Sequence, residues 1–176
     1  MNDITRHLSK LNEAMSFLDT NHVAAIAREL KAVKESGANV WIVGNGGSAS
    51  TASHLANDLT KMCHMHAFSV PDLTSIVSAN GNDNGWQYMY RDTIREYCSP
   101  ADCIIAITFS GESLNVVLAL ELKVATRILI TGPAEKTAAV MTLPNHVLRV
   151  MAQDITVAED MHMIICHALC KGIMER

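Results

Sequence analysis

The 176-residue sequence contains no block of Lys or Arg, and its formal net charge at pH 7 is −4. A chain without a basic patch offers little attraction to nucleic acid or to an anionic membrane surface. It also lacks the run of about eighteen apolar residues that a transmembrane helix requires. Its polar start, MNDITRHLSK, does not have the pattern of a secretory signal. We therefore expect a cytoplasmic protein that binds neither nucleic acid nor membrane.

Paired cysteine motifs and segments of low complexity are also absent. The five cysteines are odd in number and form no CxxC pair, which predicts reduced thiols and no disulfide framework. Hydrophobic residues make up 49% of the chain and charged residues 18%, a balance that favours a compact globule over disorder. Because no linker or repeat interrupts the chain, we expect one domain that spans residues 1–176.

The first 37 residues carry two helical patterns. Apolar residues spaced by three and four over 4–19 predict an amphipathic helix. A second pattern of this kind begins near Asn21 and stops at Gly37, a residue favoured after the end of a helix. We expect these two helices to form an N-terminal arm over residues 1–37.

Beyond this arm, continuous apolar runs alternate with helical patterns. One helical pattern follows the serine- and glycine-rich turn that contains GNGGSA, another covers 114–122, and a third closes the chain over 156–174. Strands that are apolar throughout, and not at every second residue, predict a parallel sheet with helices on both faces. The predicted fold is therefore α/β, with a doubly wound parallel sheet. Its expected strands are NVWIVG (39–44), DCIIAITF (102–109), RILIT (127–131) and HVLRV (146–150).

Two turns rich in serine and glycine follow the first two expected strands, GNGGSA after NVWIV and SGES after DCIIAITF. In doubly wound sheets, ligands bind at the carboxyl ends of the strands. Unpaired backbone N–H groups at the start of the next helix attract anions there. Hydroxyl groups nearby add neutral donors, so the two turns predict a cradle for a phosphate. These hydroxyl residues are Ser48, Ser50, Thr108, Ser110 and Ser113.

Three interpretations of the turns remain open on the residues alone. No lysine of a Walker loop is present, which argues against hydrolysis of a nucleoside triphosphate. GNGGSA matches the loose dinucleotide fingerprint G-x-G-x-x-A, but no acidic residue follows about twenty positions later to bind a ribose. A purely structural turn is the third alternative. The residues favour a bound phosphate ester over a dinucleotide and over a purely structural turn.

The segments GNGGSASTASHLANDL and ITFSGES together resemble the sugar isomerase (SIS) domain, and specifically its sedoheptulose 7-phosphate isomerase branch. The resemblance extends along nearly the whole chain, including the two N-terminal helices, GNDNGW and the last helix. It implies a homotetramer that interconverts sedoheptulose 7-phosphate and D-glycero-D-manno-heptose 7-phosphate by proton transfer through an enediol. Such enzymes supply heptose for surface-sugar synthesis.

The same resemblance implies roles for individual residues. It places a zinc site at His54, Asp58, Glu159 and His167, and the proton-transfer residues at Asp58, His167 and Glu159. Asn45 and Asp83 match positions that hold the sugar chain, while Ser48, Thr108, Ser110 and Ser113 match positions that bind the phosphate. The full substrate-binding set that it implies is Asn45, Gly46, Gly47, Ser48, Asp83, Thr108, Phe109, Ser110 and Ser113.

Without the family, the possible metal ligands remain ambiguous. His54 and Asp58 are four residues apart and share one face of a helix, as an ordinary solvated pair also would. Glu159, His162 and His167 lie in an apolar helix, where polar groups must be paired or serve a purpose. A core histidine satisfied by a carbonyl group is the alternative. Two imidazoles and two carboxylates make a plausible shell for zinc.

The sequence departs from the family pattern at two of these positions. The branch carries Glu where this chain has Asp58, and Gln where it has Glu159. A second carboxylate would neutralise a dication and weaken its Lewis acidity. Either acid is therefore a candidate base; we favour Glu159 as a ligand and Asp58 as the proton carrier. In the second loop, Thr108 and Phe109 replace the more common Ser-Thr pair.

Two alternatives to this activity remain. One is a non-catalytic SIS protein that binds a phosphosugar or a partner protein, as a DnaA-binding relative does. The other is an isomerase of a different phosphosugar. The presence of both histidines and both acids favours an enzyme, because a protein that only binds has no need of them.

Overall fold

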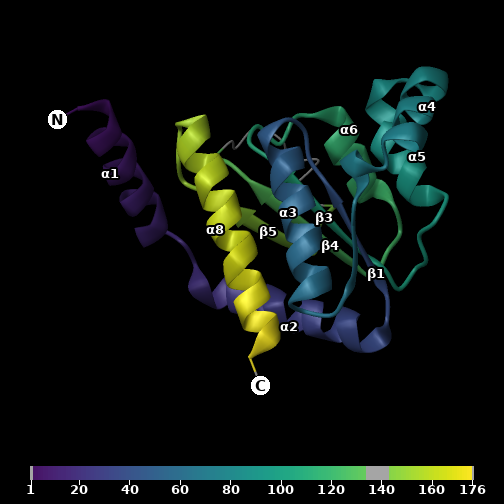
Figure 1. The fold of residues 1–176 in the computed structure, drawn as a ribbon, viewed down its shortest axis with the longest axis horizontal. Coiled ribbons are helices and arrows are strands. Elements are labelled where there is room, and N and C mark those ends of the chain that lie inside the picture. The colour runs from purple at the N-terminus through teal and green to yellow at the C-terminus, as the bar shows by residue number, and fades with distance from the viewer. Residues whose placement is uncertain (1, 134–142, 176) are drawn as a thin grey trace.

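The centre of the molecule is a sheet of five parallel strands in the order β2-β1-β3-β4-β5 (Figure 1). The structure is a computed structural model that describes residues 2–133 and 143–175. The prediction of a doubly wound parallel sheet is confirmed, and the four predicted strands are all present. The strands are β1 (Asn39–Val43), β2 (His66–Ser69), β3 (Cys103–Thr108), β4 (Thr126–Thr131) and β5 (His146–Arg149).

Helices cover both faces of this sheet, and residues from the same strand contribute to both layers of the core. Ile42 and Ile105 pack on one side with α2, α3 and α8. Trp41 and Ile104, their neighbours in the chain, pack on the other side with residues of α5 and α6. This explains why the strands are apolar at every position. The α-helices are α1 (Asp3–Ser16), α2 (Thr20–Ser36), α3 (Gly47–Lys61), α4 (Thr74–Asn84), α5 (Met89–Arg95), α6 (Leu114–Val117) and α8 (Ile155–Met174).

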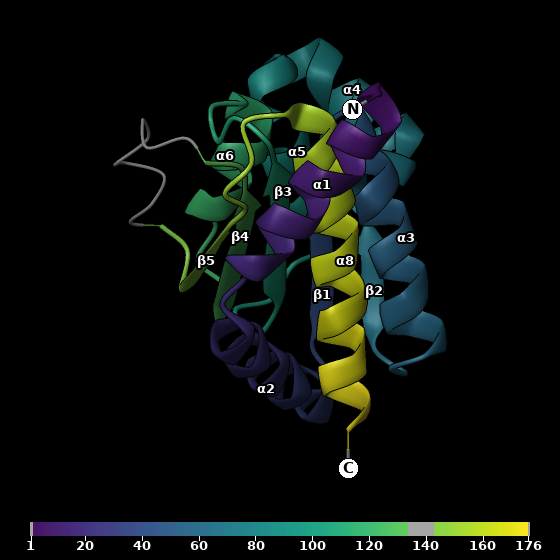
Figure 2. The ribbon, with the colours of Figure 1, turned by 90° about the vertical axis from the view of Figure 1, so that its left-hand side faces the viewer.

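The two N-terminal helices pack very differently. Helix α2 belongs to the main core, where Ile26 and Leu30 are fully buried. Helix α1 lies outside the sheet layers beside α8 (Figures 1 and 2). Its apolar side chains Ile4 and Leu8 are 74% and 58% exposed. Of the expected two-helix arm, only α1 therefore stands apart from the sheet.

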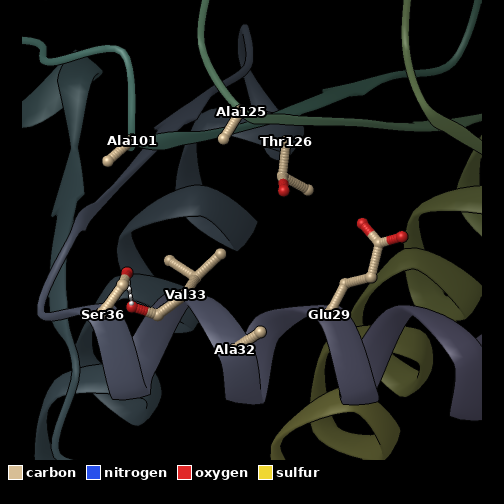
Figure 3. Close-up of a pocket in the computed structure, with 7 residues that line it drawn as sticks. All are labelled: Glu29, Ala32, Val33, Ser36, Ala101, Ala125 and Thr126. Carbon is tan, nitrogen blue, oxygen red and sulfur yellow. Dashed lines mark hydrogen bonds between the residues drawn. The ribbon is translucent and has the colours of Figure 1, made fainter.

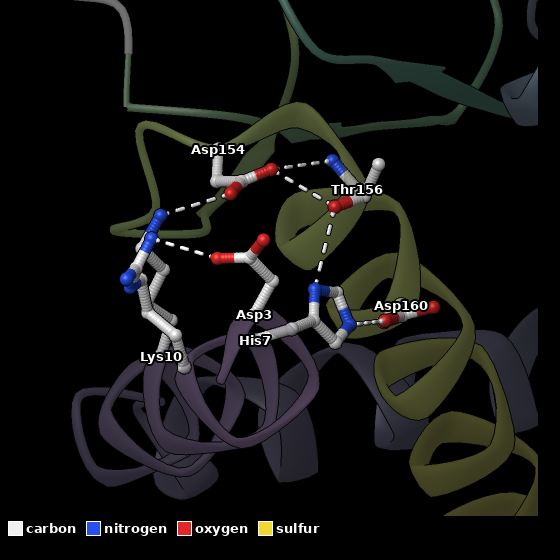
Figure 4. Close-up of polar contacts among 7 residues, drawn as sticks. Asp3, His7, Lys10, Asp154, Thr156 and Asp160 are labelled. Atoms are coloured by element: carbon white, nitrogen blue, oxygen red, sulfur yellow. Dashed lines mark hydrogen bonds and ion pairs between the residues drawn. The ribbon is translucent and has the colours of Figure 1, made fainter. Parts of the chain in front are cut away.

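Polar contacts attach α1 to the first turns of α8 (Figure 4). The Nε2 atom of His7 lies 2.8 Å from a carboxylate oxygen of Asp160. Lys10 donates a hydrogen bond of 3.0 Å to Asp154, which also caps α8. The hydrogen bond from Lys10 and those from Thr156 lower the pKa of Asp154 to about 2. These pairs orient a helix whose C-terminal half packs on the core through Ala14 and Leu11, while Ile4 and Leu8 remain exposed.

At the amino end of the sheet, the carboxylate of Asp102 accepts several hydrogen bonds. Asp102 is buried and accepts hydrogen bonds from Trp41 Nε1 at 2.8 Å and from the backbone N–H of Asn39 at 3.0 Å. Ser99 adds bonds from its N–H and its hydroxyl. Burial alone raises the pKa of Asp102, but these hydrogen bonds outweigh it and hold the pKa below its ordinary value. Asp102 therefore stabilises the fold through these hydrogen bonds.

The strand order reverses between β1 and β3. From β1 the chain moves through α3 to the edge strand β2, and it returns to form β3 on the other side of β1. The segments that follow β1 and β3 therefore start side by side, at the carboxyl ends of these two neighbouring strands. This is the position at which doubly wound proteins bind ligands. None of the helices in the described parts of the chain is long and apolar enough to cross a membrane.

Candidate active site

The loop after β1 requires glycine for steric reasons. A Cβ atom on Gly44 would lie 2.6 Å from the carbonyl oxygen of Ser48, and Gly46 has a φ of +54°. Glycine alone tolerates both conditions without strain. The tight turn allows α3 to begin at Gly47, with Ser48 buried in its first turn. The free N–H groups of this helix start are thereby presented at the carboxyl edge of the sheet.

The loop after β3 arranges its hydroxyl groups through local hydrogen bonds. Gly111, with a φ of +68°, donates its N–H to Thr108 Oγ1 at 3.3 Å. Ser110 Oγ accepts from the N–H of Glu112 at 3.1 Å, and Ser113 stands at the start of α6. These contacts fix the loop and leave the hydroxyl protons of Thr108 and Ser110 available to an acceptor. The loop thus has the donors that a phosphate needs.

A pair of amides joins the first loop to α6, the helix that follows the second loop. Asn45 Nδ2 donates to Asn115 Oδ1 at 2.9 Å, and Asn115 Nδ2 donates to Asn45 Oδ1 at 2.8 Å. The hydroxyl of Tyr90 lies 3.2 Å from Asn45 Oδ1. Sequence reasoning missed Asn115 and Tyr90. A fully buried asparagine in the apolar run LNVVLAL was the available signal, because such a side chain must be paired.

Three of the expected metal ligands, two from α3 and one from α8, converge where these helices meet. His54 and His167 place their Nε2 atoms 3.1 Å apart. Asp58 Oδ2 lies 3.3 Å from His54 Nε2 and 3.6 Å from His167 Nε2. The two imidazoles are about half exposed, while the Asp58 side chain is 11% exposed. The cluster is therefore open to solvent on the histidine side and supported by a buried carboxylate.

These spacings fit a tetrahedral metal ion. Zinc binds imidazole nitrogen and carboxylate oxygen at about 2.0–2.2 Å, so neighbouring ligand atoms in a tetrahedron lie about 3.3 Å apart. The three observed separations, 3.1, 3.3 and 3.6 Å, surround this value. Within the described residues, this is the group of histidine, cysteine and acidic side chains whose donor atoms lie close enough to share an ion.

Glu159 and Asp83, the other acidic residues expected at the site, lie outside this cluster. The carboxylate of Glu159 lies against Gly47, because a Cβ atom built there would be 2.5 Å from Glu159 Oε1. Glu159 is not part of the three-residue cluster. Asp83 is exposed on α4, where it accepts a hydrogen bond from Asn82 at 2.9 Å. The structure thus brings three of the four expected ligands together. The fourth, Glu159 of α8, has its carboxylate at the start of α3.

A separate pocket of about 320 Å³ lies at the opposite end of the sheet, between α2 and the segments that lead into β3 and β4 (Figure 3). Alanine and valine supply much of its lining. Its acid, Glu29, is paired with His146 Nε2 at 2.9 Å. This pocket contains no set of converging donors, so the carboxyl edge remains the candidate active site. The lining residues are Glu29, Ala32, Val33, Ser36, Ala101, Ala125 and Thr126.

Comparison with known proteins identifies the family to which the chain belongs. The SIS domain family matches residues 2–126 of the chain. Phosphoheptose isomerase 1 of Campylobacter jejuni is 31% identical over 159 residues, which cover 87% of this chain and 86% of the relative. Phosphoheptose isomerase of Nitratidesulfovibrio vulgaris is 29% identical over 171 residues, which cover 93% of this chain and 81% of the relative.

Solved structures give the same result for the fold. A phosphoheptose isomerase from Neisseria gonorrhoeae superimposes with a TM-score of 0.82 at 26% identity, covering 97% of this chain and 94% of that one. One from Francisella tularensis gives 0.87 at 24% identity, with both chains fully covered. The chain therefore belongs to the SIS domain family, and within that family to the phosphoheptose isomerase branch.

Proposed function

We propose that this protein is a cytoplasmic isomerase that interconverts sedoheptulose 7-phosphate and D-glycero-D-manno-heptose 7-phosphate. The observation that carries the proposal is the convergence of His167, from α8, with His54 and Asp58 on α3, the helix that starts at the predicted phosphate loop. His54 lies seven residues after Gly47, about 10 Å along α3. This separation suits a substrate with a phosphate at one end and its reacting carbons at the other.

The two loops would hold the phosphate and the sugar chain. Ser48, Thr108, Ser110 and Ser113 supply hydroxyl donors, and the start of α3 supplies backbone N–H groups. Asn45 and Asp83 are proposed to bind hydroxyl groups of the chain. Contacts at the phosphate position the reacting end and contribute binding energy to the transition state.

Isomerisation requires a base to take a proton from the carbon beside the carbonyl and an acid to return it one carbon along. We assign the proton transfer to Asp58 and His167, whose Oδ2 and Nε2 atoms lie 3.6 Å apart. If zinc occupied these two atoms, the second carboxylate oxygen of Asp58 would remain to carry the proton. The intermediate enediol carries developing negative charge on oxygen, which a cation or a donor must stabilise. Zinc held by His54, Asp58 and His167, with Glu159 as the predicted fourth ligand, would supply that positive charge.

Incubation of the protein with a panel of C5 to C7 ketose phosphates, followed by NMR of the products, tests the reaction. We expect conversion of the C7 substrate to the aldose. Binding of a phosphosugar without turnover would instead identify a non-catalytic SIS protein. Turnover of a shorter ketose phosphate alone would identify a different isomerase.

The phosphate contact is tested by Ser110→Ala. A hydrogen bond to a charged oxygen contributes about 1.5–3 kcal/mol, so KM should rise at least about tenfold while the fold is unchanged. The matched control is Ser36→Ala, whose hydroxyl bonds the Val33 carbonyl at the opposite end of the sheet (Figure 3). Equal KM values for the two variants would show that the second loop does not bind the phosphate.

We further propose a single-domain subunit that assembles as a homotetramer through α1. This helix has exposed Ile4 and Leu8 side chains, exposed Phe17 follows its last residue, and it has little reason to remain folded without a partner surface. Light scattering at micromolar concentration should give four times the monomer mass. A monomer mass would contradict the proposal.

A further inference from the structure

Phe109 is an apolar residue in the loop that carries candidate phosphate donors. It follows β3 directly, between Thr108 and Ser110. Its ring has no hydrogen-bond donor and packs against the core layer on the side of α2, α3 and α8. The side chain therefore cannot replace the hydroxyl groups of its neighbours, and its role in the loop must come from packing.

The contact partner of Phe109 is Gly132, the first residue after β4. The N–H of Gly132 donates a hydrogen bond of 3.1 Å to the carbonyl oxygen of Phe109. A Cβ atom on Gly132 would lie 2.6 Å from this oxygen, and 2.8 and 3.0 Å from the ring atoms Cδ2 and Cε2. Carbon atoms in contact prefer separations of about 3.5–4.0 Å, so a larger residue would displace Phe109. Because the φ of Gly132 is not positive, glycine is required here for space and not for backbone conformation.

Gly132 is a firm support, because the strand that precedes it is held on both sides. Thr131, the last residue of β4, is 2% exposed and pairs with Thr108 of β3. Its carbonyl oxygen accepts a hydrogen bond of 2.8 Å from the N–H of Val150, just after β5. The contact with Gly132 thus joins the loop after β3 to a strand end that has little freedom to move.

A fixed Phe109 also fixes the residues on either side of it. Consecutive Cα atoms are about 3.8 Å apart, so a displaced Phe109 backbone carries Thr108 and Ser110 with it. Thr108 Oγ1 accepts a buried hydrogen bond of 3.3 Å from the N–H of Gly111, and this bond depends on the same loop conformation. The Phe109 ring is therefore placed to control two hydroxyl donors at once.

We propose that Phe109 is a positioning residue of the phosphate site: its ring, packed on Gly132, holds the hydroxyl groups of Thr108 and Ser110 where a phosphate can accept from them. The inference rests on the proposed function, because it takes the phosphate of a phosphosugar as the acceptor. The ring supplies packing, and the two neighbouring hydroxyl groups supply the contacts.

Phe109→Thr separates packing from direct binding, because it removes the ring and adds a hydroxyl group to the loop. If the ring positions the loop, KM for sedoheptulose 7-phosphate should rise about tenfold in spite of the added donor, as expected when a hydrogen bond to a charged oxygen is weakened. The value of kcat should stay within about twofold, since phosphate contacts are made in both the ground state and the transition state. A KM equal to or below the wild-type value would overturn the proposal, including in a variant with a lower melting temperature.

Two further variants control for the loss of an aromatic ring. Phe109→Leu keeps an apolar side chain beside Gly132, so its KM should stay within about threefold of the wild-type value. Phe68→Thr removes a phenylalanine of the edge strand β2 that is 40% exposed and stacks on Trp41. Its KM should not change. An equal rise in Phe68→Thr and Phe109→Thr would contradict a specific role for Phe109.

Gly132→Ala tests the contact from the other side without altering Phe109. The added Cβ atom would meet the Phe109 carbonyl oxygen and ring, so the loop must shift and KM should again rise about tenfold. In the Gly132→Ala background, Phe109→Thr should then raise KM by less than about threefold, because both changes disrupt one contact. Full multiplication of the two effects would overturn the proposal, and so would an unchanged KM in Gly132→Ala.

Hydrogen exchange of the Gly111 amide reports the order of the loop without turnover. In protein labelled with ¹⁵N-glycine, this exchange should accelerate at least about tenfold in Phe109→Thr and remain unchanged in Phe68→Thr, because the Gly111 N–H is protected by its bond to Thr108. Equal Gly111 exchange rates in the two variants would reject the positioning role, even in an active enzyme. A wild-type protein that converts no phosphosugar would reject the proposed function, while Gly111 exchange would still show whether Phe109 orders the loop.

Discussion

Two sides of α8 place the same type of side chain in opposite surroundings. His167 is 51% exposed and lies next to His54 and Asp58 of α3. His162 is fully buried, and neither of its ring nitrogens forms a hydrogen bond of normal geometry with the described residues. Five residues rotate an α-helix by about 140°, which is enough to place the two imidazoles on different sides.

The contrast separates a candidate metal ligand, His167, from a histidine of the core, His162. His167 has neighbours whose donor atoms converge and a face open to a ligand. His162 is an imidazole confined to an apolar layer, where desolvation lowers its pKa to about 4 and the Thr131 backbone offsets only part of this effect. The exposed position of His167 beside other donor atoms suits metal binding. The burial of His162 without a charged partner makes the free energy of unfolding depend on pH.

The largest effects should follow from changes on the open side. His54→Ala and His167→Ala each remove one of the three clustered donors, so we expect loss of bound zinc and a fall in activity of about 10²-fold or more. The loss of zinc is measured as zinc content after dialysis, and the loss of activity as turnover of the C7 substrate. Acidification should also release the metal, because its ligands must be deprotonated.

The control for this experiment is His162→Leu, which changes a histidine of the same helix on the buried side. It should retain its zinc. If His162→Leu lost zinc while remaining folded, or if His167→Ala kept it, the division between the two sides of α8 would be wrong.

The next largest effect concerns acid stability and the buried side. The folded-state pKa of His162, about 4, lies below the ordinary value of 6.5. Its contribution to stability is therefore complete above about pH 6.5 and is lost as the pH falls towards 4. At pH 5 this loss is about 2 kcal/mol. Urea unfolding at pH 7 and pH 5 should show a smaller acid loss in His162→Leu than in the wild type. Equal losses would mean that His162 charges freely in the folded state.

The smallest effect is expected from Glu159→Gln. Glu159 lies against Gly47, outside the three-donor cluster, and glutamine is the residue that the family resemblance places there. An amide can still act as an oxygen ligand, so the variant should keep its zinc and most of its activity. If Glu159 were the base, kcat would fall by about 10²-fold while zinc and substrate still bound. Such an inactive, zinc-loaded variant would move the proton-transfer role from Asp58 to Glu159.

Not every element could be predicted from the sequence. Strand β2 was missed because it is a short edge strand with exposed His66 and Phe68, so it has no apolar run. Helix α4 was missed because only Val77 is buried along its length, which leaves no apolar stripe. The helical pattern at 114–122 was real, but it forms one turn of α-helix, α6, followed by a 3₁₀ turn. Elements that bury little surface leave little trace in the sequence.

The sequence by itself determined the parallel sheet, the positions of the two glycine loops and the shared face of His54 and Asp58. These follow from local rules: burial on both faces makes a strand apolar throughout, and four residues make about one helical turn. The tertiary structure alone decided that His167 meets this pair, that Glu159 lies against Gly47 and that Tyr90 contacts Asn45. Each of these contacts joins separate helices or loops. Their relative placement depends on how side chains pack between layers, and spacing along one segment does not encode it.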